Sequence, residues 1–151
     1  MSKKSILALA LLILAPLLIY FLWPTDEARI KRLFKEGAKA VEARKADDVM
    51  SKISYSYTDR DGLSYAALKQ GVEREFQVMS NIRVEYDITR IEVREKTATA
   101  GMDVRVIASY GKDTGYVVGD AARPAHLSFS LEKGPTGWLI DGSEGIKGGF
   151  Y

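Results

Sequence analysis

Residues 57–62 carry the side chains best suited to acid/base chemistry. They read Tyr-Thr-Asp-Arg-Asp-Gly, so two carboxylates, Asp59 and Asp61, stand just before a turn-forming glycine. A carboxylate held beside apolar walls has a raised pKa and can move a proton next to a carbonyl group. We therefore take Asp59 as the candidate catalytic residue. The alternative is structural, because an aspartate before a turn often accepts hydrogen bonds from the backbone N–H groups of the next few residues.

Tyrosines form a second group of candidates, since an aromatic ring with a polar tip suits the wall of a ligand pocket. The chain has 8 of them. Those that we expect to contact a ligand are Tyr57, Tyr65, Tyr86 and Tyr116. The alternative for each is cross-strand packing, which occupies many tyrosines in β-rich domains.

The single histidine, His126, is a weaker candidate. It alternates with Ala125, Leu127 and Phe129, so it falls on the polar face of an expected strand. One histidine and no cysteine exclude a multi-histidine or thiolate metal site, and we predict no metal. The glycines form neither a phosphate-binding P-loop nor G-x-G-x-x-G after a strand, so no cofactor is expected.

Composition narrows the class of protein further. A length of 151 residues fits one domain of ordinary size. Apart from Lys3 and Lys4, the remaining 20 Lys and Arg balance the 20 Asp and Glu. A neutral domain without a basic stripe is a poor nucleic-acid binder, because phosphate neutralisation dominates that affinity.

An uncharged apolar run begins at Ile6 and ends at Trp23. As a helix it spans about 27 Å, close to the thickness of a bilayer core. We interpret it as a retained, single-pass transmembrane signal anchor in contact with the lipid bilayer. A cleaved signal peptide and a buried soluble helix are the alternatives, but bulky residues and Pro24 occupy the place of a small-residue cleavage site.

The orientation of this anchor depends on two opposing clusters of positive charge. Lys3 and Lys4 favour a cytoplasmic N-terminus, which sends the domain to the periplasmic or extracytoplasmic side. The reverse is favoured by a basic cluster beyond the anchor, which consists of Arg29, Lys31, Arg32 and Lys35. We expect the extracytoplasmic side, because a four-residue tail before an apolar run is typical of anchors that translocate the rest of the chain.

Helical periodicity dominates the next third of the chain. Apolar residues at three- and four-residue spacing predict one amphipathic helix over about residues 26–46. Asp47 and Asp48 start a short second helix. Ser64 caps a third, which we expect to end near 80–81.

After that the period changes to two, which predicts strands. They run from 82 to 93 with a bulge at Thr89 and Arg90, from 97 to 110, from 125 to 131, and from 138 to 141. Residues 111–123 read as a long loop with room for a short strand at 116–118. Helices followed by consecutive strands predict an α+β domain with three helices on a curved, mainly antiparallel sheet of about four strands. We expect an anchor at 1–24, this domain at 25–145 and a flexible tail at 146–151.

These signals together resemble the NTF2-like superfamily, the cone fold that includes SnoaL-like and ketosteroid-isomerase-like domains. The matching features are the first helix with its Arg-Lys-Ala-Asp-Asp ending, the segment 57–62, the third helix and the final Gly-Trp-Leu-Ile-Asp strand. In ketosteroid-isomerase-like members a D-x-x-G element supplies a general base at the pocket mouth, and the resemblance gives that role to Asp59. The family's mechanism also needs an oxyanion tyrosine on the first helix, which has none between Asp26 and Ala46.

We therefore expect a membrane-tethered, non-catalytic module that binds a partner protein, itself membrane-associated, or a small apolar ligand. The alternative is an acid/base enzyme of isomerase, dehydratase or cyclase type that uses Asp59 on a hydrophobic substrate. Since many members of the superfamily pair through the sheet, a homodimer is also expected. Its contact surface would be the polar outer face of the sheet, which carries Arg83, Glu85, Asp103, Arg105, His126 and Ser128.

Overall fold

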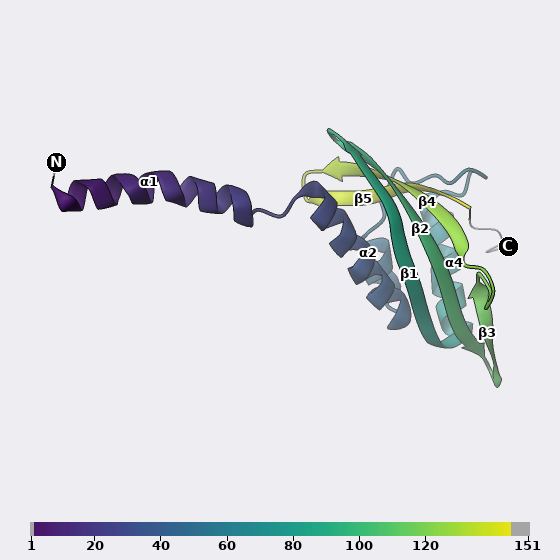
Figure 1. Ribbon diagram of the computed structural model, residues 1–151. Helices are drawn as coiled ribbons and strands as arrows, with labels where there is room; N and C mark the ends of the chain where they lie inside the picture. The colour runs from purple at the N-terminus through teal and green to yellow at the C-terminus, as the bar shows by residue number, and fades with distance from the viewer. Residues whose placement is uncertain (1, 146–151) are drawn as a thin grey trace.

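The computed structural model describes residues 2–145 and consists of an N-terminal helix followed by an α+β domain (Figure 1). The helices are α1 (Lys3–Leu22), α2 (Asp26–Glu42), α3 (Ala46–Met50) and α4 (Tyr65–Val78). The strands are β1 (Met79–Arg94), β2 (Thr97–Tyr110), β3 (Asp113–Val118), β4 (Ala125–Gly134) and β5 (Gly137–Glu144). The predicted tail at 146–151 lies outside the described residues.

The strands form one antiparallel sheet in the order β1-β2-β4-β5. The first half of β2 pairs with β4 and its second half pairs with β3, so the sheet has five strands where we expected about four. The additional strand begins at Asp113, because Gly111, at a φ of 61°, turns the chain back onto β2 within two residues. The prediction of three helices on a curved antiparallel sheet is confirmed.

Helix α2 begins where the sequence predicts and ends earlier. The Thr25 Oγ1 atom accepts a hydrogen bond from the Ala28 N–H at 3.1 Å, which caps the helix. The helix stops at Glu42 instead of about 46, because Arg44 adopts a left-handed φ of 54° and the chain turns away.

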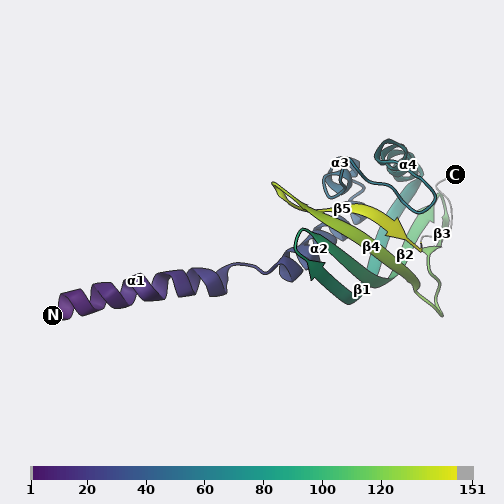
Figure 2. The same cartoon turned by 90° about the horizontal axis from the view of Figure 1, so that it is seen from above.

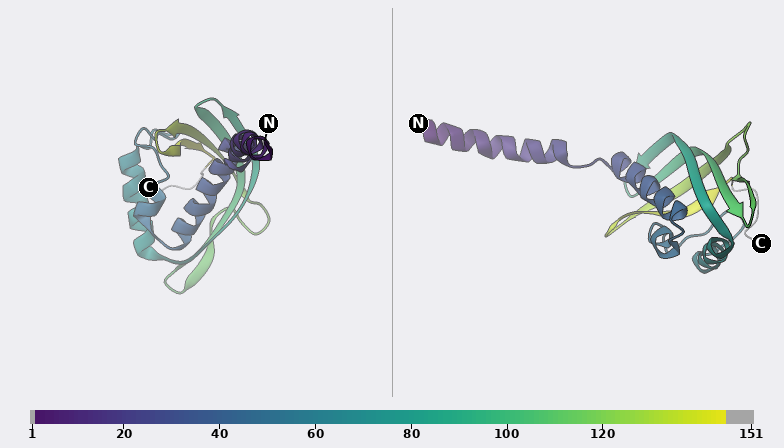
Figure 3. Two further views of the ribbon diagram at one scale, coloured as in Figure 1. Left: turned by 90° about the vertical axis from the view of Figure 1, so that its left-hand side faces the viewer. Right: turned by 90° about the horizontal axis from the view of Figure 1, so that it is seen from below.

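The predicted end of the third helix near 80–81 is also wrong. Helix α4 stops at Val78, and β1 begins at the next residue. A register shift between Ser80 and Arg83 comes next, and a second shift between Ile88 and Arg90 confirms the predicted bulge. Bulges increase the local twist and bend of a sheet. The sheet accordingly curves around α2, as the view along α1 shows (Figure 3, left).

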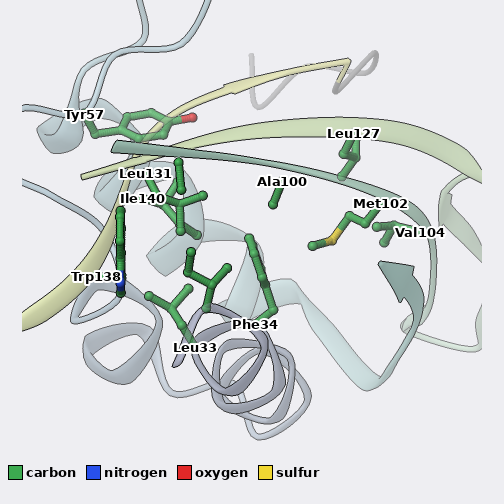
Figure 4. Close-up of a cluster of buried hydrophobic side chains, with 12 residues drawn as sticks. Leu33, Phe34, Tyr57, Ala100, Met102, Val104, Leu127, Leu131, Trp138 and Ile140 are labelled. Atoms are coloured by element: carbon green, nitrogen blue, oxygen red, sulfur yellow. The ribbon is translucent and has the colours of Figure 1, made fainter. Parts of the chain in front are cut away.

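The core lies between this concave face and the helices. The alternation predicted for β2 is confirmed, since Ala98, Ala100, Met102 and Val104 are all buried. From the other side, Leu33 and Phe34 of α2 point toward the sheet residues, while Trp138 closes one end of the cluster (Figure 4). Helices α3 and α4 lie side by side over the sheet (Figure 2).

Helix α1 projects away from the domain, and none of its residues is buried (Figure 1). Its 20 residues are apolar enough to cross a membrane by length and composition. At about 1.5 Å of rise per residue the helix is about 30 Å long, the thickness of a bilayer core. Three residues, 23–25, connect it to α2, and the Arg29 guanidinium lies 5.9 Å from the centre of the Trp23 ring.

Candidate ligand-binding cavity

A cavity of about 270 Å³ lies between the concave face of the sheet and helices α2, α3 and α4. The side chains around it are overwhelmingly apolar. Those from the helices include Leu33, Phe34, Val41, Val49, Leu68 and Val72, and those from the sheet include Met102, Val104, Val106, Leu127, Phe129 and Ile140. Because a water molecule occupies about 30 Å³ of liquid, the cavity has room for a molecule of roughly ten non-hydrogen atoms.

Small residues on the inner surface of α2 create this space. Gly37 and Ala38 both line the cavity. A Cβ atom built on Gly37 would meet no heavy atom within 4 Å, so the space beside this glycine is open. Helix α4 packs against α3 and β1 more closely than against α2, and Gly37 stays partly exposed.

The cavity contains few polar groups. The hydroxyls of Tyr57 and Ser143 are hydrogen-bonded to each other at 2.6 Å, and both residues are buried. The ammonium group of Lys52 is paired with the Glu36 carboxylate at 2.7 Å. Burial raises the pKa of the Tyr57 hydroxyl, and the nearby charge of Asp59 adds to this rise, while the hydrogen bond with Ser143 opposes it. The Tyr57 phenol is therefore neutral at physiological pH.

Two of the four candidate tyrosines line the cavity and two do not. Tyr57 comes from the loop after α3, and Tyr86 comes from β1. The Tyr65 ring packs instead against the Tyr55 ring, with 4.8 Å between the centroids. Tyr116 lies opposite Ile107 in the β2–β3 pair and is 45% exposed.

Asp59 lies outside the set of residues that line the cavity. Its Oδ1 atom accepts hydrogen bonds from the backbone N–H groups of Asp61, at 2.9 Å, and Leu63, at 2.7 Å. The Gly62 N–H donates to the Asp59 carbonyl at 3.1 Å, which closes the turn. Asp59 is still near enough for its charge to raise the pKa of Tyr57.

Sequence reasoning missed Ser143. Strict alternation from the inward-facing Ile140 would turn residue 143 outward. A register shift changes this, because Leu131 pairs with Ile140 while Ser130 pairs with Gly142, so Asp141 is an extra residue in β5. Ser143 thereby lies opposite Phe129 and faces the cavity with it. A glycine directly before this serine was the only local sign of an irregular strand.

The outer face of the sheet carries the histidine, as the alternation predicted. The His126 side chain is 81% exposed, and its Nδ1 atom contacts the Asp103 carboxylate across β2 and β4. Within residues 2–145 no three His, Cys, Asp or Glu side chains gather in a way that could hold a metal ion.

A larger hollow of about 840 Å³ lies on the surface between α2 and β1. Charged side chains such as Lys31, Lys35, Lys39 and Asp87 line it. These four residues are exposed and the hollow is broad, so it offers an apolar molecule little burial. The smaller cavity, with its apolar lining, is the better candidate for a binding site.

Solved structures of the same shape identify the fold. An NTF2-like superfamily protein from Salmonella enterica aligns with a TM-score of 0.66 at 14% identity, over 82% of this chain and 92% of that chain. The chain has the NTF2-like cone fold. An NTF2-like protein with a cystatin-like fold from Novosphingobium aromaticivorans aligns over 95% of this chain and 89% of its own, at 16% identity and a TM-score of 0.61.

A third similar structure is a provisionally named scytalone dehydratase from Novosphingobium aromaticivorans. It aligns at 15% identity over 77% of this chain and 79% of its own, with a TM-score of 0.66. At such identities the likeness concerns the fold alone, and one fold hosts many functions. No protein-family profile and no curated protein matches the chain.

Proposed function

We propose that this chain is a non-catalytic NTF2-like module that binds a small apolar ligand in the cavity between helices and sheet. The observation that carries the proposal is the lining of the cavity, which is apolar except for a few side chains, of which Tyr57, Ser143 and Lys52 already have partners. Asp59, the candidate general base, is not part of that lining. An apolar molecule of suitable size would gain about 25 cal/mol for each Å² of apolar surface that it buries there.

The test uses substitutions at Gly37, which lines the cavity and where an added Cβ meets no heavy atom within 4 Å. Gly37→Leu fills the space, and Gly37→Ala is the matched control because it changes the helix propensity but adds only one methyl group. The full chain in lipid nanodiscs is titrated with the hydrocarbon indane. A ligand that binds the native state raises the unfolding temperature.

We expect indane to raise the unfolding temperature of the wild type and of Gly37→Ala, and to leave that of Gly37→Leu unchanged. Equal shifts in all three proteins would mean that indane acts elsewhere, and no shift in the wild type would contradict the proposal.

An acid/base enzyme remains the second candidate, and one observation favours it. Asp59 is near enough to the cavity residue Tyr57 to influence the pKa of its hydroxyl. Asp59→Asn keeps an oxygen acceptor for the turn but removes the base. If a turnover is found for this protein and Asp59→Asn abolishes it without loss of indane binding, the proposal of an acid/base enzyme replaces that of a non-catalytic module.

The proposal includes an anchor function for α1, with the domain on the extracytoplasmic side. The length and apolar composition of the helix and the two lysines at its start support this. Because the chain has no cysteine, Thr136→Cys on the exposed β4–β5 hairpin gives a single labelling site. A membrane-impermeant maleimide should label it in intact cells. Labelling only after lysis would place the domain on the cytoplasmic side.

We also propose that the outer face of the sheet mediates homodimer formation. Supporting features are the mixed charges on this face, including the Arg83–Glu85 pair at 2.9 Å and the His126–Asp103 contact. Ser128→Arg introduces a bulky charge there and should convert a dimer to a monomer in analytical ultracentrifugation. Thr136→Arg, on the hairpin, is the control that should leave the mass unchanged. A monomeric wild type would contradict this part of the proposal, as would a dimer that survives Ser128→Arg.

A further inference from the structure

The two hydroxyls of the cavity belong to buried residues. Tyr57 is 5% exposed and Ser143 is 7% exposed. Their oxygens are 2.6 Å apart, and either hydroxyl can be the donor of the hydrogen bond between them. They come from distant parts of the chain, the loop after α3 and the end of β5, and both line the cavity.

A count of hydrogens shows that this pair is incomplete. Two hydroxyls carry two hydrogens, and the bond between them uses one. Neither oxygen has another hydrogen-bond partner within residues 2–145. The second hydrogen therefore has no acceptor in the described part of the protein, and a buried donor without an acceptor is unfavourable.

The other polar groups of the cavity do not change the need for an acceptor of this second hydrogen. Lys52 donates to Glu36, so its charge is already neutralised and does not call for an anionic ligand. Tyr86 is only partly buried and also borders the surface hollow, where water can serve its hydroxyl. The phenol of Tyr57 is neutral at physiological pH, because burial raises its pKa, and it keeps its hydrogen.

We propose that the ligand of this cavity is a neutral, mainly apolar molecule with one hydrogen-bond acceptor, a carbonyl or ether oxygen, that accepts the free hydrogen of the Tyr57–Ser143 pair. Its apolar body would lie against Phe34 and Phe129, whose rings are 5.3 Å apart, and against Met102. This inference rests on the proposed function and names the chemical class of the ligand.

Indane and 1-indanone form a matched pair of probes, because they share a carbon skeleton and differ by one carbonyl oxygen. The full chain in lipid nanodiscs is titrated with each, and the free probe is measured in the aqueous phase. The decisive variant is Tyr57→Phe with Ser143→Ala, since either single substitution leaves one hydroxyl that can still donate. Tyr65→Phe removes a tyrosine hydroxyl outside the cavity and is the control.

We expect the double variant to bind 1-indanone about tenfold more weakly than the wild type, as the loss of one hydrogen bond predicts, and to bind indane as tightly as before. The Tyr65→Phe control should bind both probes as the wild type does. Equal effects on both probes, or no effect on either, would overturn the inference while the apolar cavity stands as a binding site. Failure of the wild type to bind either probe would overturn the proposed function as well.

A second measurement needs no variant. The infrared carbonyl stretch of 1-indanone moves to lower frequency when the oxygen accepts a hydrogen bond. Bound to the wild-type chain, the probe should absorb at a lower frequency than in cyclohexane or when bound to the double variant. A frequency equal to that in cyclohexane would contradict the inference even if the double variant fails to fold.

Discussion

The carboxylate of Asp26 accepts a hydrogen bond from the indole Nε1 of Trp138 at 3.1 Å, which joins the first residue of α2 to the start of β5. The Lys133 ammonium donates to the same Oδ1 atom at 2.9 Å. Because α2 begins only three residues beyond the apolar helix, these hydrogen bonds lie close to the point at which the domain meets that helix.

Replacing this carboxylate should lower the stability of the domain. Asp26→Ala removes both hydrogen bonds, and since the side chain is 32% exposed we expect a loss of about 1 kcal/mol in the free energy of unfolding. Glu27→Ala is the matched control, because Glu27 is also in the first turn of α2 and forms an exposed ion pair with Lys31. Urea unfolding of the full chain in nanodiscs measures both. Equal losses of stability in Asp26→Ala and Glu27→Ala would mean that both carboxylates act only through the helix dipole.

The same contact predicts a pH dependence. The pKa of Asp26 lies below its usual value of 3.8, mainly because Lys133 donates a hydrogen bond to the carboxylate and also because Trp138 does. A carboxyl with a lowered folded-state pKa contributes stability above its unfolded pKa and loses it as the pH falls further. The stability difference between wild type and Asp26→Ala should therefore be constant from pH 7 to about pH 5 and shrink as the pH falls below 3.8. A difference that grows on acidification would contradict this.

Gly37→Ala should stabilise the protein. Glycine in the interior of a helix is less favourable than alanine by about 1 kcal/mol, and the added Cβ meets nothing within 4 Å. We expect an increase in the free energy of unfolding of 0.5 to 1 kcal/mol, roughly, measured by urea unfolding. Destabilisation would show that the surface of α2 around Gly37 is closed in solution.

Asp59 should act on stability through the turn that it closes. Asp59→Ala removes the acceptor of the Asp61 and Leu63 N–H groups and should cost about 1–2 kcal/mol. Asp59→Asn keeps an oxygen in that place and should cost less. Asp61→Ala is the control in the same turn, since Asp61 is exposed. If all three variants unfold like the wild type, the turn does not depend on this carboxylate.

Gly142 allows the loop of residues 52–58 to approach β5. A Cβ on Gly142 would lie 2.5 Å from the Ser130 hydroxyl and 3.2 Å from the Thr58 carbonyl oxygen. Gly142→Ala should therefore destabilise the protein by about 1–3 kcal/mol, as overpacking does. Removing the Ser130 hydroxyl, as Ser130→Ala, should recover part of this loss, and a double-mutant cycle measures the coupling. Additive effects would contradict the close contact.

Much of the fold could be predicted from local patterns. The alternation in β2 and the spacing of apolar residues in α2 each identified the buried face, because one period dominates each segment. Element ends were less predictable. Helix α4 passes into β1 without a loop. The residue with a positive φ near this junction is Asn81, at 49°, so neither a glycine nor a proline marks the change from helix to strand.

The site was predictable only in part, for a geometric reason. Tyr57 and Tyr86 were identified as wall residues from their type alone, yet Tyr65 and Tyr116, of the same type, lie elsewhere. Ser143 faces the cavity because Asp141 is an extra residue in β5. Such a bulge depends on the pairing between strands, which a single-strand pattern does not contain.

Uptake of a small apolar molecule by the cavity is tested most directly by methyl NMR. The full chain in nanodiscs, labelled at its Leu, Val and Met methyl groups, is titrated with indane. We predict saturable chemical-shift changes at Met102, Val104 and Leu33, and none at the exposed Val93 and Val117. Changes confined to the exposed methyls, or changes at Met102 that persist undiminished in Gly37→Leu, would contradict the account.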